Sequence, residues 1–309
     1  MTLYEKYEQA REQYLASLKI ITKSNATYEK YAFILGNFGE YVKMHGGEES
    51  EVPPLFIVGW RNEIKDRRNL ANSSLRHYLT LLHSFFKWTI EHKIFTEQPV
   101  GKGDFPKKEA VEYDLLTEPE IEKILSGKIP PDSMSTTSIR NRALIILVLT
   151  SGVRVSELIN LRIGDLDFNK HVITVRHGKG DKKRAVTFPS VAEGFVEEYI
   201  RWRYGTNLAP KTAFLFDYKG DDEKPHKYTR QNITQVVKSY VFRLTGHARI
   251  GTHDLRHSYA SYMLTHGVPI QEIQALLGHE SYTTTLIYAN QLCPERVATN
   301  LNSIFTNPK

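Results

Sequence analysis

The sequence predicts a mainly helical (α+β) protein with two domains and one small antiparallel sheet. Three observations support this prediction. Apolar residues recur at helical spacing before residue 99, residues 99–113 are rich in Gly, Pro and charge, and two stretches with period-two alternation follow that segment. We therefore expect a helical domain at 1–98, a linker at 99–113 and a mixed, mostly helical domain at 114–309, which is an ordinary size for each domain.

The first domain is expected to contain four helices. One clear helix begins at a cap of Ser24 or Asn25, a second begins at Ser73 or Ser74, and weaker patterns cover residues 3–20 and 54–67. The apolar stripes of the two clear helices are Tyr28, Tyr31, Leu35, Phe38 and Val42, and Leu75, Leu79, Leu82, Phe86 and Ile90.

The second domain is expected to begin with a helix after the capping box Thr117-Glu118-Pro119-Glu120. Residues 139–149 are apolar on every helical face, which predicts a buried helix that ends at Gly152. Strands at 171–175 and 184–188 flank a polar loop and predict a hairpin. Further helices are expected at 156–161, 190–204, 230–245, 254–266, 269–277 and 281–289.

The composition favours a polyanionic partner and excludes several classes of protein. The net charge is +6 and the pI is near 9.1, although a merely basic soluble protein would show the same values. The single cysteine, Cys293, excludes an internal disulfide and a multi-cysteine metal site, and it suits a reducing cytoplasm. The N-terminus lacks a signal-peptide pattern, and the longest apolar run, Ala143–Leu149, is too short to cross a bilayer. We expect a cytoplasmic protein without a membrane partner.

Six side chains in a spaced series suit the transfer of a phosphodiester to a phenol. They are Arg154, Lys179, His253, Arg256, His279 and Tyr288. A phosphodiester gains negative charge in its pentacoordinate transition state, so fixed cations around it stabilise that state more than the ground state. A mobile ammonium can protonate the leaving oxygen, and nearby cations favour the nucleophilic phenolate of a tyrosine. No metal or other cofactor is needed.

The two arginines stand in patterned neighbourhoods, and the core is expected to anchor Arg154. Arg154 follows the break at Gly152, and Arg256 lies on one helical face with His253. Thr252 is a plausible cap that would aim the positive end of this helix at the same anion. A single arginine is usually only a surface charge, so the hypothesis depends on the combination.

The two histidines near Arg256 also allow a different interpretation. His253 and His257 have the i, i+4 spacing of a zinc site, but Asp254 stands where a metalloprotease has Glu, and Arg256 would repel a metal. His253 is therefore expected to serve in proton transfer or phosphate contact, and His257 to be a buried hydrogen-bonding residue. We predict no metal site.

Lys179 and Tyr288 each have neighbours of the same type. The segment Gly178-Lys179-Gly180 lacks the spacing of a nucleotide-binding loop, and Lys182 and Lys183 leave open a purely electrostatic contact with DNA. Tyr282 is six residues from Tyr288, a rotation of about 240° along a helix, so the two phenols would not reach one site.

These segments resemble the tyrosine recombinase (phage integrase) family. The similarity covers residues 114–290 in the family's order, and the helical first half resembles the family's core-binding domain more loosely. The small departures are Val153, where Leu or Met is commoner, and Asn290, where the family often has His. The matching boxes are Thr150-Ser151-Gly152-Val153-Arg154-Val155-Ser156-Glu157-Leu158, Gly178-Lys179-Gly180-Asp181-Lys182-Lys183-Arg184, His253-Asp254-Leu255-Arg256-His257-Ser258, Leu276-Leu277-Gly278-His279 and Thr283-Thr284-Thr285-Leu286-Ile287-Tyr288.

The resemblance implies a mechanism. Tyr288 would attack the scissile phosphate and form a 3′-phosphotyrosyl link, with a free 5′-hydroxyl. Arg154, Arg256 and His279 would hold the phosphate, Lys179 would protonate the leaving oxygen, and His253 would assist proton transfer. Glu157 would support the catalytic residues without contacting the DNA itself.

The resemblance also implies partners. The chain would be a monomer or weak oligomer when free, and a homotetramer on double-stranded DNA with a specific recombination site, where strands exchange through a Holliday junction. The segment Pro294–Phe305 has Val297, Leu301 and Ile304 or Phe305 at helical spacing and resembles a tail that packs on a neighbouring protomer, or folds back on its own domain. On the first domain, we expect Thr27, Lys30, Arg76 and Lys87 to contact DNA, although each could belong to a solvated helix face.

The biological role stays open at this point. The helical domain starts near Met1, so no arm-binding domain is expected, and the pattern favours a simple Xer-like resolver of chromosome or plasmid dimers or a small mobile-element integrase. A type IB topoisomerase and a catalytically silent DNA-binding relative are the alternatives.

Overall fold

The computed structural model describes most of the chain, namely residues 1–21, 25–53, 55–109, 113–128, 137–176, 183–205, 209–219 and 224–278. The chain divides into two compact units, Met1–Val111 and Glu112–Lys309. Lys179, His279, Tyr288, the helix expected at 281–289 and the segment Pro294–Phe305 lie outside the described residues.

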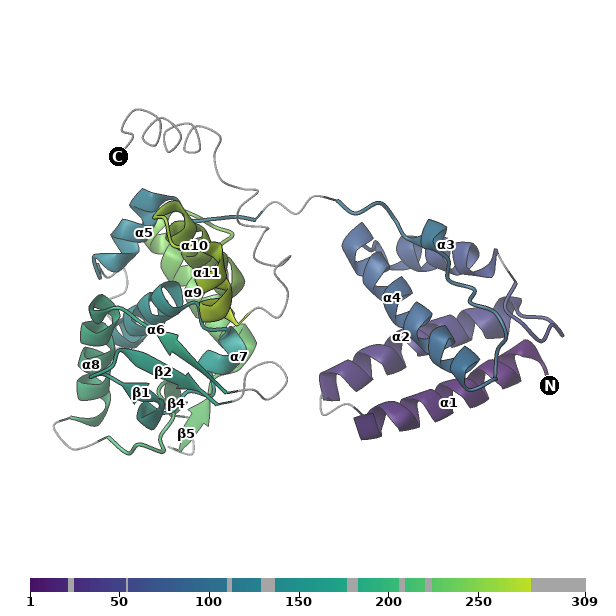
Figure 1. The fold of residues 1–309 in the computed structure, drawn as a ribbon, viewed down its shortest axis with the longest axis horizontal. Helices are drawn as coiled ribbons and strands as arrows, with labels where there is room; N and C mark the ends of the chain where they lie inside the picture. The colour runs from purple at the N-terminus through teal and green to yellow at the C-terminus, as the bar shows by residue number, and fades with distance from the viewer. Residues whose placement is uncertain are drawn as a thin grey trace, which may run out of the picture. The chain divides into compact units, whose positions relative to one another are not determined.

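The N-terminal unit is helical. Its helices are α1 (Leu3–Ile21), α2 (Asn25–His45), α3 (Phe56–Arg68) and α4 (Asn72–Glu91), and a 3-10 turn follows at Lys102–Asp104. Helices α1 and α2 lie side by side, and α4 packs against both (Figure 1). The unit is closed by aromatic rings packed edge to face, with Phe38 against Tyr7, Trp60 and Phe86 at centroid distances of 5.4, 5.3 and 5.9 Å.

Residues that follow α4 also pack on the N-terminal unit. Val100 is buried in its core, and the carbonyl of Asp104 accepts a hydrogen bond of 2.9 Å from Arg61 Nη1. Helix α4 begins at Asn72 after an extended Ala71, earlier than the Ser73 or Ser74 that we expected.

The C-terminal unit surrounds one buried helix. Helix α6 (Thr137–Ser151) packs against α8 (Ser190–Tyr204), α9 (Arg230–Thr245) and α10 (Thr252–Thr265), as Figure 1 shows. Every side chain from Ala143 to Leu149 is at most 3% exposed. The prediction of a helix that is apolar on all faces is thus confirmed, and its buried side chains belong to the domain core.

The remaining elements cover this core. Before α6 lies α5 (Glu118–Leu125), where the Glu120 carboxylate accepts a hydrogen bond of 2.8 Å from the Thr117 backbone N–H. The others are α7 (Val155–Leu158), a 3-10 turn at Ile163–Asp165, β1 (Leu166–Asp167), β2 (Val172–Val175), β3 (Arg184–Thr187), β4 (Asp217–Lys219), β5 (Pro225–Lys227) and α11 (Ile270–Leu277).

Strands β1, β2 and β3 form an antiparallel sheet in that order, with Ile173 opposite both Leu166 and Val186. Strands β4 and β5 form a separate antiparallel pair. The predicted fold class, mainly α with a small antiparallel sheet, is confirmed. Helix α7 is shorter than the expected 156–161, because the carbonyl of Leu161 accepts a hydrogen bond from the Leu215 N–H and the chain leaves the helix to make this contact.

Candidate active site

Arg154 stands at a sharp break after the buried helix α6. Gly152 has a φ of +61°, and a Cβ at this position would lie 2.7 Å from the Tyr259 ring and 2.8 Å from Leu277 Cδ2. Only glycine combines this left-handed backbone with so close an approach of two side chains. The turn lets Arg154 adopt an extended conformation and start α7, so its position is fixed from the core outward.

The carboxylate of Glu157 binds both the backbone and the side chain of Arg154. Oε2 accepts a hydrogen bond of 2.8 Å from the Arg154 N–H, and Oε1 accepts one of 3.0 Å from Arg154 Nη1. The Glu157 side chain is only 1% exposed, whereas that of Arg154 is 21% exposed. The guanidinium of Arg154 is therefore partly exposed while its Nη1 is held by a buried anion.

Glu157 stays ionised in this buried place. Burial raises the pKa of its carboxyl, but hydrogen bonds from Arg184 and Arg154 outweigh this effect and lower the pKa below its ordinary value. The carboxylate is a permanent countercharge at the base of the site.

Arg256 joins the ends of two helices to α10. It is 4% exposed, its Nη1 donates to the carbonyl of Gly152, and its Nη2 donates to the carbonyl of Leu277 at 2.5 Å. Arg154 Nη2 donates to the next carbonyl, that of Gly278, at 2.9 Å. Both arginines thus hold the end of α11, and His279 is the next residue in the chain.

The start of α10 differs from our expectation in one respect. Thr252 is the first helical residue, and the preceding Gly251 is the cap; its N–H donates to Asp254 Oδ2 at 2.8 Å. The prediction that Thr252 caps the helix was wrong, because the Asp254 carboxylate binds the Gly251 N–H and the helix starts one residue earlier, with Gly251 as the cap.

The two histidines of α10 have different environments. His253 is exposed, and His257 is partly buried with its ring centroid 4.3 Å from that of Tyr113. Burial lowers the pKa of His257 to about 4, so this imidazole is neutral at pH 7. The two histidine rings are 6.5 Å apart, and among the described residues no group of three or more His, Cys, Asp or Glu could hold a metal ion.

Three of the six expected catalytic residues lie within the described part of the chain. Arg154 donates a hydrogen bond to the residue after α11, and Arg256 donates one to the residue after α6. His253 lies one turn before Arg256 on α10. Lys179, His279 and Tyr288 lie outside the described residues, and their roles stay predictions.

Arg184 is a site residue that the sequence did not single out, although it stands in a predicted strand and at the end of the hairpin box. Its Nη2 donates to Glu157 Oε2 at 2.8 Å, and its Nη1 donates to Oε1 of the same carboxylate. The available signal was its place, five residues after Lys179 in a segment that resembles the family's hairpin.

The four residues expected to contact DNA lie on the N-terminal unit. Thr27 and Lys30 are exposed on α2, and Lys87 is exposed on α4, 4.0 Å from Glu91. Arg76 is partly buried: it donates to the carbonyl of Pro106, and its guanidinium lies 5.5 Å from the Phe105 ring centroid. Arg76 therefore also ties residues 105–106 to α4.

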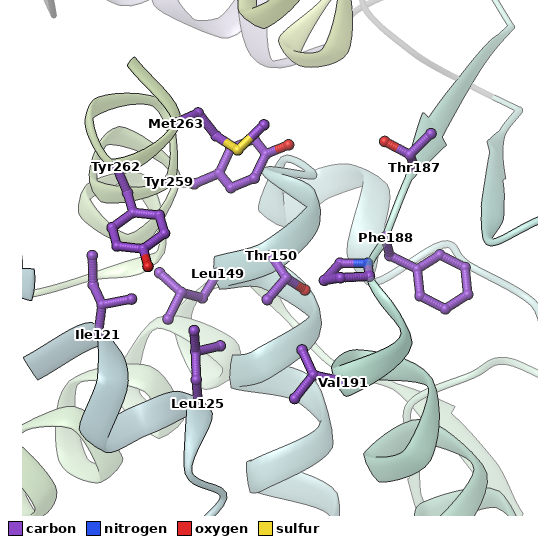
Figure 2. Close-up of a pocket in the computed structure, with 11 residues that line it drawn as sticks. Ile121, Leu125, Leu149, Thr150, Thr187, Phe188, Val191, Tyr259, Tyr262 and Met263 are labelled. Atoms are coloured by element: carbon purple, nitrogen blue, oxygen red, sulfur yellow. The ribbon is translucent and has the colours of Figure 1, made fainter. Parts of the chain in front are cut away.

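An apolar pocket of about 450 Å³ opens on the C-terminal unit. Its lining side chains come from α5, α6, α10 and the junction of β3 with α8 (Figure 2). They are Ile121, Leu125, Leu149, Thr150, Thr187, Phe188, Pro189, Val191, Tyr259, Tyr262 and Met263. No helix in the described ranges is long and apolar enough to span a membrane.

Comparison with known proteins identifies the family. The profile of the phage integrase family matches residues 114–293. The tyrosine recombinase XerD of Ralstonia nicotianae is 31% identical over 233 residues, which cover 75% of this chain and 72% of XerD. The tyrosine recombinase XerA of Thermococcus onnurineus is 32% identical over 280 residues, or 90% of this chain and 89% of XerA.

A solved structure shows the same fold. The Tn1549 transposon integrase in complex with a circular intermediate DNA aligns with a TM-score of 0.74 and 17% identity, over 98% of this chain and 99% of that chain. Fold, family profile and relatives together define a DNA-recombining enzyme of the tyrosine recombinase class. The chain belongs to the phage integrase family, and within it to the Xer-like type.

Proposed function

We propose that this enzyme cuts and rejoins duplex DNA at a specific site through a covalent bond between Tyr288 and a 3′-phosphate. Arg154, Arg256 and His279 bind the non-bridging oxygens of the scissile phosphate. Lys179 protonates the departing 5′-oxygen, and His253 assists proton transfer. The phosphotyrosyl bond conserves the energy of the phosphodiester, so rejoining requires neither ATP nor a metal.

One observation carries this proposal: two guanidiniums from distant parts of the sequence are anchored on adjacent carbonyls. Arg256 binds the carbonyl of Leu277, and Arg154 binds that of Gly278. Two fixed cations beside the end of α11 can stabilise a phosphate whose negative charge increases in the transition state. Their anchors are formed within the free protein, so little reorganisation is needed when DNA binds.

The proposal is tested by trapping the covalent product in EDTA. The purified protein is incubated with fragments of its source genome and denatured, and the protein-linked DNA ends are sequenced. We expect recurrent ends at one type of site, and a nucleotide-bearing peptide that contains Tyr288 in mass spectrometry. Attachment to another residue, or a strict need for added Mg²⁺, would contradict the mechanism.

The proposed partners are double-stranded DNA and three further copies of the chain, which together exchange strands through a Holliday junction. The apolar pocket supports this assembly, because it offers uncharged walls to the apolar stripe of Val297, Leu301 and Ile304 from a neighbouring protomer. We place the reaction in the cytoplasm, since a lone cysteine suits a reducing compartment.

The assembly is tested with Val191→Asp, which puts a charge at the rim of the pocket. Val191 is 40% exposed, so the substitution should leave the fold intact. We expect DNA binding to persist, while complexes of four protomers and strand exchange are lost, as also in Leu301→Asp. Native mass spectrometry on site DNA measures this.

Phe242→Asp is the matched control for Val191→Asp, because Phe242 is 52% exposed on α9 and does not line the pocket. It should assemble like the unchanged protein. Normal assembly of Val191→Asp would refute docking in this pocket.

The biological role is proposed as either the resolution of chromosome or plasmid dimers or the integration and excision of a mobile element. The genomic position of the trapped ends distinguishes the two. Ends at one chromosomal locus support resolution, whereas ends at the borders of a repeated element support integration.

A further inference from the structure

Arg184 lies beside Arg154 in the candidate site, although it is not one of the six expected catalytic residues. It begins strand β3, and its guanidinium binds both oxygens of the buried Glu157 carboxylate, while Arg154 binds the same two oxygens through Nη1 and its backbone N–H. The Arg184 side chain is 16% exposed. One buried anion is therefore shared by two cations.

We propose that Arg184 is a positioning residue whose charge neutralises Glu157 and so leaves the positive charge of Arg154 available to the scissile phosphate. This inference rests on the proposed function of Arg154 as a phosphate ligand. It assigns Arg184 no contact with DNA, because it acts through the carboxylate.

Charge balance is the first argument. With Arg184 present, the cluster of Arg154, Glu157 and Arg184 carries two positive charges and one negative charge. Without Arg184, Glu157 would balance Arg154 alone, and the pair would present little net charge to an anion. In a partly buried site this difference is weakly screened, so it acts on the transition state more strongly than at a surface.

Steric contact is the second argument. A Cβ at Gly278 would lie 2.9 Å from Arg184 Cδ, so the side chain of Arg184 lies directly against this residue, whose φ is +62°. Arg154 Nη2 binds the carbonyl of the same glycine at 2.9 Å. Arg184 thus joins three segments at one point: its own strand, the carboxylate that holds Arg154, and the end of α11.

The sheet contains a matched pair that separates positioning from ordinary stability. Arg176 follows β2 and binds the carboxylate of Asp165, whose side chain is 2% exposed, as Arg184 binds that of Glu157. No contact joins Asp165 to Arg154 among the described residues. The Arg176 side chain is 53% exposed and that of Arg184 16%, so their losses differ in stability, but a purely structural role would leave the attachment rate of the folded protein unchanged in both.

The experiment measures the rate of covalent attachment to site DNA at saturating protein, the affinity for the same DNA, and the melting temperature. Arg184→Met should slow attachment by about tenfold or more, less than the hundredfold or larger effect of removing a direct transition-state donor. Affinity should change only by about threefold, since binding draws on many phosphate contacts. Arg176→Met should melt earlier yet attach at the normal rate once folded.

Removal of the Glu157 carboxylate should restore the attachment rate that Arg184→Met loses. In the double variant Arg184→Met, Glu157→Gln, no buried carboxylate cancels the charge of Arg154, so most of the lost rate should return. Arg184→Lys, which keeps the charge but loses the two-point contact, should lie between Arg184→Met and the unchanged protein. This variant keeps the test decisive if Arg184→Met fails to fold.

The outcomes are distinguishable from a failure of the proposed function. If the unchanged protein forms no adduct at Tyr288, the proposed function itself is wrong. If it forms the adduct and Arg184→Met attaches at the normal rate, or the double variant stays as slow as Arg184→Met, the role of Arg184 is refuted.

Discussion

Replacement of Tyr288 by Phe should abolish covalent attachment to DNA and strand exchange, while DNA affinity stays within about twofold. The phenol oxygen is the only group lost, and no attacking atom replaces it, so the rate should fall by at least about 10⁴-fold, as for loss of a catalytic nucleophile. Gel shifts on site DNA measure binding, and denaturing gels measure attachment.

Tyr282→Phe is the matched control for this prediction. It removes the same atom six residues earlier and should leave attachment and exchange unchanged. Attachment that survives Tyr288→Phe but disappears in Tyr282→Phe would transfer the nucleophile to Tyr282. Full recombination by Tyr288→Phe would show that Tyr288 is not the nucleophile and that the reaction follows another chemistry.

Arg256→Ala should remove cleavage and also weaken the fold. Loss of one fixed donor to a transition state costs on the order of 10²–10³ in rate. The buried carbonyls of Gly152 and Leu277 would each lose a hydrogen bond from a cation, at about 1–3 kcal/mol of unfolding free energy apiece. Thermal unfolding and the rate of covalent attachment measure the two effects separately.

Arg142→Ala provides the comparison for Arg256→Ala. Arg142 also anchors a carbonyl, that of Gly127 at 3.1 Å, and binds Glu198 within the same unit. It should lower the melting temperature and leave the rate of attachment of the folded protein intact. Equal loss of rate in both variants would reduce Arg256 to a structural residue.

The helices could be predicted because their apolar residues recur with a clear period. Helix α6 is the strongest case: its apolar run leaves no polar face, and the structure buries residues 143–149 almost completely. The short strands β1, β4 and β5 escaped prediction, because two or three residues cannot show alternation. The pairing of these strands depends on contacts between segments, which no local sequence pattern predicts.

For the candidate site, the sequence indicated the identity of the cationic side chains but not their connections. Arg154 and Arg256 followed from their neighbourhoods. The shared carboxylate of Glu157 and the involvement of Arg184 depend on tertiary contacts across 27 residues of chain, which no local pattern encodes. The cap of α10 was predicted wrongly for a local reason: the Asp254 carboxylate accepts a hydrogen bond from the Gly251 N–H, so the helix begins at Thr252 rather than after it.

Helix α6 supports the candidate active site from within the core, since residues 143–149 are at most 3% exposed. Each of its turns between Ala143 and Leu149 meets a neighbour, and Arg154 follows its last residue, Ser151, by only three positions. We therefore expect residues 143–149 to tolerate only apolar exchanges of similar volume. Substitutions that adapt the enzyme to a new DNA target are therefore expected elsewhere in the chain. Recombinases of this type can then change the DNA they recognise while the buried helix stays apolar.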